Sequence, residues 1–247
     1  EAGPPLPPAV VLNLERRQDR WDAVGRRLEP LGLRFRRWAA VDGVASSPAA
    51  ISTDLVALRW STARNWEYVV KVFEGGKQCG YEPKELPLTG GERGCAASHA
   101  AVWRHVAEGV HGGGPLVVLE DDAKPTPAFA SRLPQALAAL REEEPDVLFL
   151  GYTQAAPWRR KVGAAVREAE YLWTTVGYVL WPAGARKLLE ALPIDQPVDN
   201  FISNLMRLGT LSGFAVVPAI LKQAEAWNVN NDVAHSDDAA WKQNCAA

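Results

Sequence analysis

The chain has 247 residues, 47% of them hydrophobic, which is enough for one sizeable core and one large α/β domain. Its formal net charge of −2 gives no overall field that would attract nucleic acid or an anionic membrane surface, so no nucleic-acid partner is expected. No apolar run reaches the roughly 18 residues that a membrane-spanning helix needs, so no such segment is expected in this sequence.

Strand and helix patterns alternate along the chain. Apolar runs rich in β-branched and aromatic residues predict strands at 9–14, 34–41, 116–119, 146–150, 171–181 and 214–217. Apolar residues spaced by three and four predict helices at 19–32, 89–109, 127–141, 182–192 and 197–208. This alternation predicts an α/β fold, with a mostly parallel sheet and helices on both faces, in a single domain over residues 9–247.

Local signals set several helix boundaries. Asp19 is an N-cap candidate, and Gly32 is a candidate for the residue that ends the same helix. Thr89 and Glu92 form a capping box that opens the helix 89–109.

Two parts of the sequence are irregular. Residues 44–88 are expected to form an aromatic-containing excursion with one short helix, in which Trp60 and Trp66 are candidates for stacking on an acceptor. Residues 223–247 are polar and are expected to form a C-terminal tail over the site.

The start of the chain and its cysteines bear on its origin. The only methionine is Met206, and residues 1–8 are Pro-rich without a signal-peptide pattern, so we expect a processed chain or a domain cut from a longer protein. Its location stays open between the lumen of the endoplasmic reticulum or Golgi, if a eukaryotic leader has been removed, and the bacterial cytoplasm. Cys95 is expected to be a buried thiol, and a disulfide between Cys79 and Cys245 is allowed in a lumenal protein.

Three adjacent carboxylates follow the predicted strand 116–119. Glu120, Asp121 and Asp122 lie at its carboxyl end, where open α/β sheets bind their ligands. If the extended backbone continues, Glu120 and Asp122 point to one side and Asp121 to the other. Two carboxylates on one side can hold Mn²⁺ or Mg²⁺ while substrate phosphates take the remaining positions. The alternative is a solvated acidic turn that caps the next helix.

Other polar residues have both a structural and a functional interpretation. His235 is either a surface histidine of a polar tail or a third metal ligand that folds back over the site. His99, next to Ser98, is either a hydrogen-bonded core histidine or a group beneath the acidic loop that orients the loop or the ligand. Asp199 either complements the dipole of its helix or acts as a general base at the rim of the site.

Several motifs of other enzyme classes are missing from the sequence. Neither G-x-x-x-x-G-K-[ST] nor a G-x-G-x-x-G after the first strand occurs, which argues against a P-loop nucleotidase and a dinucleotide-dependent dehydrogenase. The sequence also lacks the G-x-S-x-G elbow of an α/β-hydrolase. With four histidines in the chain, a metal-dependent phosphoesterase would be short of ligands.

A set of short stretches occurs in a fixed order between residues 11 and 199. The stretches are 11–20 (VLNLERRQDR), 40–43 (AVDG), 88–99 (LTGGERGCAASH), 118–123 (VLEDDA), 177–178 (GY) with 184–185 (GA), and 197–199 (PVD). Together they resemble glycosyltransferase family 25, which includes bacterial lipooligosaccharide galactosyltransferases and the collagen hydroxylysine galactosyltransferases. The specific part of the resemblance is the order, with the block 88–99 ahead of 118–123.

The resemblance implies a GT-A fold, a UDP-hexose donor and inversion at the anomeric carbon. It also implies that the acidic strand end, with Glu120 in place of the usual first Asp, is the counterpart of the D-x-D metal motif and binds Mn²⁺ or Mg²⁺. The expected metal ligands are Glu120, Asp122 and His235. The expected donor-binding residues are Asn13, Arg17, Arg20, Asp42, Ser98, His99 and Asp121. The expected catalytic base is Asp199, with Asp237 as the second candidate.

The expected activity is transfer of a hexose, galactose before glucose, from a UDP-sugar to a glycan or to a protein acceptor such as hydroxylysine. The alternative is a degenerate transferase fold that binds a sugar or a nucleotide without catalysis, since a fold does not settle function. The intact acids at 120–122 and Asp199 favour the enzyme.

Overall fold

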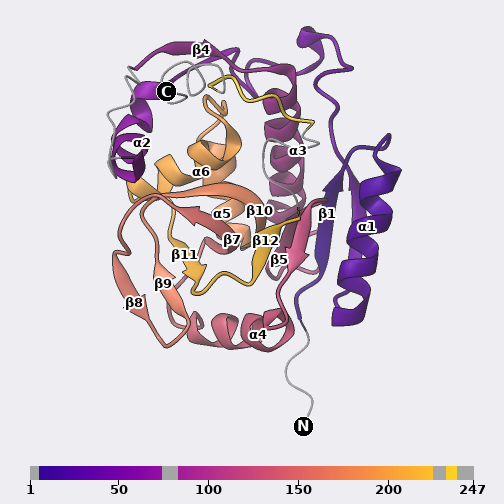
Figure 1. Ribbon diagram of the computed structural model, residues 1–247, viewed down its shortest axis with the longest axis vertical. Helices are drawn as coiled ribbons and strands as arrows, with labels where there is room; N and C mark the ends of the chain where they lie inside the picture. The colour runs from indigo at the N-terminus through magenta and orange to yellow at the C-terminus, as the bar shows by residue number, and fades with distance from the viewer. Residues whose placement is uncertain (1–5, 74–82, 225–231, 238–247) are drawn as a thin grey trace.

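An eight-stranded sheet forms the centre of the computed structural model, which describes residues 6–73, 83–224 and 232–237 (Figure 1). Across the sheet the strands follow the order β2-β1-β5-β10-β7-β11-β9-β8. Their bounds are β1 Ala9–Asn13, β2 Phe35–Ala39, β5 Leu116–Glu120, β7 Val147–Gln154, β8 Arg160–Val162, β9 Val166–Glu168, β10 Leu172–Leu180 and β11 Gly213–Val216. Strands β9 and β10 run against the other six, so the prediction of a mostly parallel sheet is confirmed.

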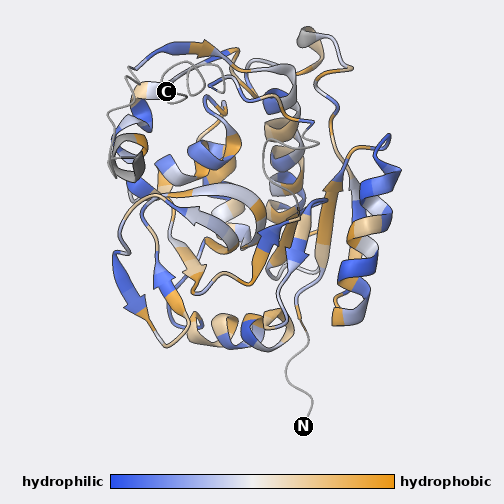
Figure 2. Ribbon diagram, viewed as in Figure 1, coloured by the Kyte–Doolittle hydropathy of each residue, from blue (hydrophilic) through white to orange (hydrophobic). Residues whose placement is uncertain are grey.

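Helices cover both faces of this sheet, which confirms the predicted α/β class. They are α1 Gln18–Leu28, α2 Trp66–Phe73, α3 Gly90–Ala107, α4 Phe129–Ala139, α5 Pro182–Glu190 and α6 Val198–Arg207. Val10 and Leu12 of β1 face a hydrophobic cluster with α3, α5 and α6, whereas Val11 faces a second cluster with α1 and α4. Figure 2 shows β1 as a hydrophobic strand beside α1, most of whose residues are hydrophilic. No helix within the described ranges is both long and apolar enough to cross a membrane.

The helix ends agree with the predicted caps in α3 and differ in α1. In α3, Thr89 Oγ1 accepts a hydrogen bond from the Glu92 amide at 3.1 Å, and the Glu92 carboxylate accepts one from the Thr89 amide at 2.8 Å. Helix α1 follows Arg17 rather than Asp19, and the Asp19 carboxylate is occupied by an ion pair with Arg17 at 2.9 Å. Gly32, at a φ of 66°, ends the short 3₁₀ turn after α1, where a left-handed residue is needed.

The described parts of the excursion, residues 44–73 and 83–88, are folded against the rest of the chain. Its regular elements, besides short 3₁₀ turns, are β3 Arg59–Ser61, α2 Trp66–Phe73 and β4 Glu85–Pro87. Trp60 is 1% exposed and donates its indole N–H to Ser236 Oγ at 2.8 Å. The expectation that Trp60 stacks on an acceptor is therefore wrong, because its ring faces are covered; Trp66 is 37% exposed.

Strands of three residues escape the sequence patterns, because so short a segment does not show a period of two. They include β8, β9 and the antiparallel pair of β6 (Ala123–Pro125) with β12 (Leu221–Gln223). Strand β12 lies close to the sheet because glycine leaves room for it: a Cβ on Gly177 would stand 2.2 Å from Leu221 Cδ1. This pairing returns the chain to the acidic end of β5.

The backbone after β2 crosses the start of α3 at very short range. A Cβ on Gly94 would lie 2.6 Å from both the Gly43 nitrogen and the Val41 carbonyl oxygen. The Val41 amide donates to Ser98 Oγ at 2.8 Å, and that hydroxyl donates to the Gly94 carbonyl at 2.7 Å. These contacts fix the first turns of α3 beside the carboxyl end of β2.

The substitution Gly94→Ala should lower the free energy of unfolding by about 1–3 kcal/mol, because the added methyl group meets backbone atoms of the neighbouring segment. Gly25→Ala in α1 is the matched control, since the nearest atom to its Cβ is 3.8 Å away and alanine stabilises a helix interior by up to about 1 kcal/mol. Urea unfolding followed by circular dichroism measures both variants. A Gly94 variant as stable as the wild type would contradict the close approach.

Candidate functional site

A cavity of about 210 Å³ opens at the carboxyl ends of β1, β2 and β5, the edge at which α/β sheets bind ligands. Its walls are the segments after these strands, the inner face of α3, the first half of β10 and the start of α6. Among the described residues it is lined by one arginine, Arg20, and by seven carboxylic acids: Asp42, Glu92, Glu120, Asp121, Asp122, Asp199 and Asp232.

The acids at the end of β5 have different partners. The backbone turns after Glu120, so the extended form does not continue through Asp122 and the expected alternation of sides does not apply. Glu120 Oε1 accepts a hydrogen bond from Thr175 Oγ1 at 2.6 Å and lies 3.4 Å from His99 Nε2. The Asp122 carboxylate accepts a hydrogen bond from the side-chain amide of Gln223 at 3.2 Å.

Asp121 faces the N-terminal part of the chain. Its carboxylate accepts a hydrogen bond from Asn13 Nδ2 at 2.7 Å and forms an ion pair with Arg20 at 2.7 Å. Asn13 is 1% exposed, and its side-chain amide also donates to the Arg17 carbonyl at 3.1 Å. Asn13 therefore ties the end of β1 to the acidic turn from behind the cavity wall.

Asp122 carries the least compensated charge of the turn. Burial raises the pKa of Asp122 to about 7, and repulsion by Glu120 and Asp121 adds to the shift. Within the described part of the chain, Asp122 Oδ1 is buried without a hydrogen-bond partner. A buried carboxylate oxygen of this kind is costly unless a proton or a cation joins it. The oxygen donors and the excess of negative charge therefore fit a hard divalent cation.

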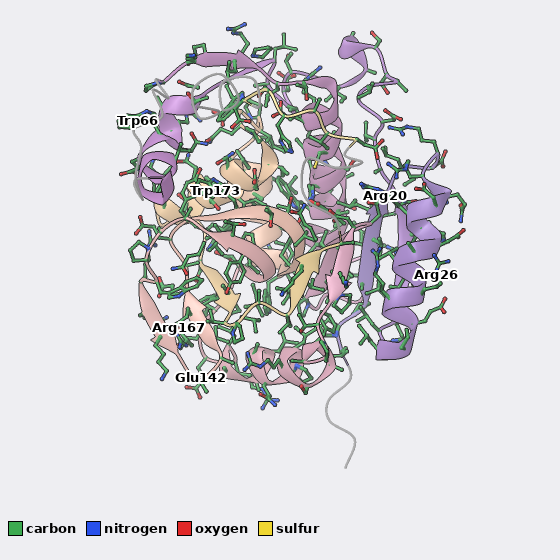
Figure 3. The ribbon with its side chains drawn as sticks, viewed as in Figure 1. Arg20, Arg26, Trp66, Glu142, Arg167 and Trp173 are labelled. Atoms are coloured by element: carbon green, nitrogen blue, oxygen red, sulfur yellow. The ribbon has the colours of Figure 1, made fainter. Side chains whose placement is uncertain are left out.

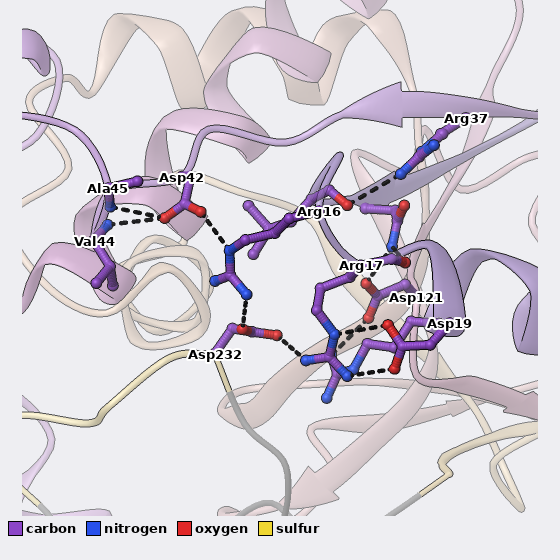
Figure 4. A network of polar contacts seen from close by, with 12 residues as sticks. Arg16, Arg17, Asp19, Arg37, Asp42, Val44, Ala45, Asp121 and Asp232 are labelled. Atoms are coloured by element: carbon purple, nitrogen blue, oxygen red, sulfur yellow. Dashed lines mark hydrogen bonds and ion pairs between the residues drawn. The ribbon is translucent and has the colours of Figure 1, made fainter.

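Ion pairs join the segment 232–237 to the start of the chain (Figure 4). Asp232 pairs with Arg16 at 2.8 Å and also with Arg17. Arg16 contacts Asp42 at 2.6 Å, and its guanidinium holds the pKa of the Asp42 carboxyl below its usual range. The segment 232–237 therefore lies against the loops that follow β1 and β2.

Glu92 makes more contacts than a helix cap needs. Its Oε1 accepts hydrogen bonds from the amide and the hydroxyl of Ser236, both at 3.0 Å, and lies 3.9 Å from His235 Nδ1. Burial raises the pKa of Glu92. The ligand atoms of Glu92, His235 and Asp237 all lie within 4.8 Å of one another, so these three residues form a second acidic group at the cavity.

His99 lies fully buried beneath the acidic turn. Its Nδ1 is 2.8 Å from the Tyr178 hydroxyl, which also accepts a hydrogen bond from Trp103 Nε1 at 3.0 Å. Its other ring nitrogen faces Glu120. His99 is therefore a hydrogen-bonded core histidine that also neighbours the acidic turn.

Asp199 occupies the start of α6, on a different wall. Its two carboxylate oxygens accept hydrogen bonds from the amides of Thr174, at 3.0 Å, and Asn200, at 2.8 Å. Thr174 has a φ of 75°, a left-handed conformation that costs a non-glycine residue on the order of 1 kcal/mol or more. The carboxylate is thus held against the irregular part of β10.

Nine of the twelve site residues expected from the sequence line the cavity. They are Arg20, Asp42, Ser98, His99, Glu120, Asp121, Asp122, Asp199 and His235. Asn13 and Arg17 lie behind the wall, and Asp237 lies in the group with Glu92. In the described ranges, the candidate metal ligands group as Cys95 with His99 and Glu120, and as Glu92 with His235 and Asp237, whereas Glu120, Asp122 and His235 form no such group.

Sequence reasoning overlooked four residues of the site. It assigned Glu92 to the capping box alone, although Glu92 lies inside the block 88–99. Thr175 lies where the strand pattern of 171–181 is interrupted, and this interruption was the feature of the sequence that could have indicated its role. Gln223 and Asp232 have no local signal, because their approach depends on the return of the chain through β12.

Cys95, which was expected to be a buried thiol, is partly buried. Cys95 is a free thiol that lines the cavity from the inward face of α3. Burial raises the pKa of this thiol well above its usual range. The expected pairing of Cys79 with Cys245 lies outside the described residues.

The fold and the cavity define an α/β protein with an acidic ligand site at the carboxyl ends of its parallel strands. The model of a family described as "Glycosyltransferase family 25 (LPS biosynthesis protein)" matches residues 7–172. This chain belongs to glycosyltransferase family 25.

Curated relatives resemble this chain over 78% of its length. It is 32% identical over 199 residues to the probable inactive glycosyltransferase 25 family member 3 of Bos taurus, and 28% identical over 200 residues to procollagen galactosyltransferase 1 of Danio rerio. The match covers 30% of each of these two proteins. Among solved structures, a glycosyltransferase involved in glycosylation of the major capsid of PBCV-1 is 9% identical with a TM-score of 0.35, over 75% of this chain and 66% of that chain.

The substitution Asp122→Asn should increase stability most at high pH. The pKa of Asp122 is raised to about 7 in the folded state, so the folded chain retains a proton that the unfolded chain releases near pH 4. The wild type therefore loses stability as pH rises from roughly 4 to 7. The asparagine side chain of the variant does not titrate. The unfolding free energy of the variant minus that of the wild type should therefore rise by at least about 1 kcal/mol over this range, measured by urea unfolding in metal-free buffer.

Asp42→Asn is the opposite case and serves as the control. Arg16 lowers the pKa of Asp42, so the carboxylate stabilises the folded state above its unfolded pKa, roughly 4, and this stabilisation fades as pH falls. The Asp42 variant should lose stability at high pH relative to the wild type. The same pH trend in both variants would contradict the difference between the two carboxylates.

Proposed function

We propose that this chain is a metal-dependent inverting glycosyltransferase that moves a hexose from a UDP-sugar to a glycan or protein acceptor. The observation that carries the proposal is the acidic cavity in a member of family 25, with seven carboxylic acids against one arginine among the described lining residues. A donor diphosphate would add further negative charge, which such a cavity accepts when a divalent cation is bound as well.

Glu120 and Asp122 are the proposed carboxylate ligands of Mn²⁺ or Mg²⁺, with His235 as the third ligand. Because the ligand atoms of these three residues do not group in the described ranges, the proposal requires their side chains to draw together when the ion binds. When bound, the ion offsets the charge that develops on the leaving diphosphate. Arg20 and Arg17 are the proposed donors of charge-assisted hydrogen bonds to the phosphate oxygens. The buried Asp122 oxygen without a hydrogen-bond partner in the described chain supports this assignment.

The remaining donor contacts are assigned to the N-terminal half of the cavity, and the proposed residues are Asn13, Asp42, Ser98, His99 and Asp121. Asp42 follows β2 at the cavity wall, where its carboxylate can accept hydrogen bonds from the nucleoside. Asn13 and Ser98 act through the backbone segments that they fix, because their side chains already bond to Asp121 and to the start of α3.

Asp199 is the proposed catalytic base. In a one-step inversion, its carboxylate takes the proton of the acceptor hydroxyl as that oxygen bonds to the anomeric carbon and UDP leaves from the opposite face. The amides of Thr174 and Asn200 hold both of its oxygens in a fixed orientation. Asp237 is the second candidate for the base.

The names of the relatives rank the substrates to be tested. One relative is named a procollagen galactosyltransferase, which supports galactose as the first sugar to test and a protein as one acceptor. Glucose is the second proposed sugar, and hydroxylysine is the proposed residue of a protein acceptor. The description of the family as an LPS biosynthesis protein supports a glycan acceptor. We assign the transfer to a single GT-A-like domain over residues 9–247, with 44–88 as an excursion and 223–247 as a tail over the site.

A catalytically inactive module that binds a sugar or a nucleotide is the second candidate, because relatives from Bos taurus and Homo sapiens are named as probable inactive and inactive members of the family. Luminescent detection of UDP release from UDP-galactose, UDP-glucose and UDP-N-acetylhexosamines, with and without Mn²⁺, separates the two. Mn²⁺-dependent release supports the enzyme. Donor binding by calorimetry without release from any donor supports the module.

The substitution Asp122→Ala should reduce metal-dependent transfer by at least about 100-fold, because charge on the leaving diphosphate would lose its compensation. Thermal unfolding should show that the variant is folded. Glu142→Ala is the matched control, since Glu142 is exposed and lies at the lower left of the view in Figure 3, away from Arg20 at the right. Transfer that survives Asp122→Ala with unchanged dependence on Mn²⁺ would contradict the metal assignment.

The substitution Asp199→Asn should reduce kcat by about 100-fold or more while the affinity for UDP stays within about twofold, because the amide keeps the shape but takes up no proton. Asp195→Asn, four residues earlier and outside the cavity lining, is the control. Initial rates and calorimetric UDP titrations measure the two effects. Equal losses in rate and in UDP affinity would make Asp199 a binding residue instead.

A further inference from the structure

We propose that Cys95, His99 and Glu120 form a metal site on the α3 side of the cavity, which binds Zn²⁺ or another thiophilic divalent ion. Their ligand atoms all lie within 4.8 Å of one another. Tetrahedral zinc places its ligand atoms roughly 3–4 Å apart, so small rotations of the side chains close the site.

Two well-anchored elements carry the three ligands. Cys95 and His99 are four residues apart in α3, so both side chains project from the same face of that helix. The start of α3 is fixed by its capping box and by the close approach of the backbone after β2. Glu120 ends β5, whose partners in the sheet are β1 and β10. The site is thus held by secondary structure on both sides.

His99 is oriented in the manner of a metal ligand. Its side chain is fully buried, and in the described part of the chain its Nε2 has no hydrogen-bond partner, with Glu120 Oε1 at 3.4 Å. Its Nδ1 lies 2.8 Å from the Tyr178 hydroxyl. When Nδ1 carries the proton and donates it to Tyr178, the Nε2 lone pair points toward Glu120 and is available to an ion. An outer hydrogen bond of this kind fixes the tautomer of metal-binding histidines.

The ligand set differs in kind from the set proposed for the donor. Sulfur, imidazole nitrogen and one carboxylate oxygen suit Zn²⁺, whereas Mg²⁺ and Mn²⁺ prefer carboxylates, carbonyls and water. All three side chains also line the cavity, so a fourth position is open to water or to a ligand. Three protein ligands and one open position are typical of accessible zinc sites.

The two sets share Glu120. Zinc held by Cys95 and His99 would withdraw this carboxylate from the ion proposed for the donor, so Zn²⁺ should inhibit transfer competitively with Mn²⁺. The inference itself does not rest on the proposed function, because occupancy of the site is measured without a sugar donor.

The test uses the full chain, purified free of metal and titrated with Co²⁺ as a spectroscopic probe. The expected result is a thiolate-to-cobalt charge-transfer band in the near ultraviolet that saturates near one equivalent and disappears when Zn²⁺ is added. Cys95→Ser should abolish the band and weaken Zn²⁺ binding by more than about tenfold, because a direct ligand is lost. Tyr178→Phe should keep the band but weaken Zn²⁺ binding by roughly 10- to 100-fold, as loss of an outer partner does.

The double variant Cys79→Ser with Cys245→Ser is the matched control, since it keeps Cys95 and should keep the band. Circular dichroism checks the fold of each variant, and Cys95→Ala replaces Cys95→Ser if the latter is unfolded. A band that persists without Cys95, or that is lost in the double variant, would overturn the proposal. An intact band and Zn²⁺ binding, together with no UDP release from any donor when the zinc-free chain is assayed with Mn²⁺, would overturn the proposed function and leave this site standing.

Discussion

The concentration of negative charge at the end of β5 is the constraint on which the site depends. Three adjacent carboxylates cannot be buried together unless each finds a partner. One is bound by an asparagine of β1 and an arginine of α1, another by a threonine of β10 and a histidine of α3, and the third by a glutamine of β12. The elements around the cavity therefore converge on this turn, and the charge that stays uncompensated is concentrated on Asp122.

The same charge balance governs the arginines at the start of the chain. Arg17 pairs with Asp19 and Asp232, and Arg20 pairs with Asp121. A diphosphate that enters the cavity competes with these carboxylates for both guanidinium groups, so the arginines alone do not supply the positive charge that it needs. Under the proposed function, a divalent cation and a rearrangement of the Asp232 ion pairs contribute together to donor binding.

The predictable parts of this molecule are those set by long periodic segments and by sheet topology. Each of the six predicted strands and five predicted helices is present, because each contributes hydrophobic side chains to the two clusters that flank the sheet. The acidic residues at the end of β5 were placed correctly because parallel strands end at one edge. The role of Glu92 was not predictable, since a capping box already explained this residue. Gln223 was not predictable because it reaches the site on a strand of three residues, and Asp232 because it reaches the site by a long-range ion pair with Arg17.

Strand β10 connects the two halves of the proposed chemistry. Its irregular start, at the register shift against β7 between Trp173 and Gly177, includes Thr174, whose backbone is left-handed, and Thr175 next to it. The Thr174 amide donates to Asp199, and the Thr175 hydroxyl donates to Glu120. Neighbouring residues of one strand thus hold the proposed base and a proposed metal ligand, so a shift of β10 would displace both carboxylates together. The left-handed conformation of Thr174 thus coincides with this double contact, in which the Thr174 backbone amide serves one carboxylate and the Thr175 side chain serves the other.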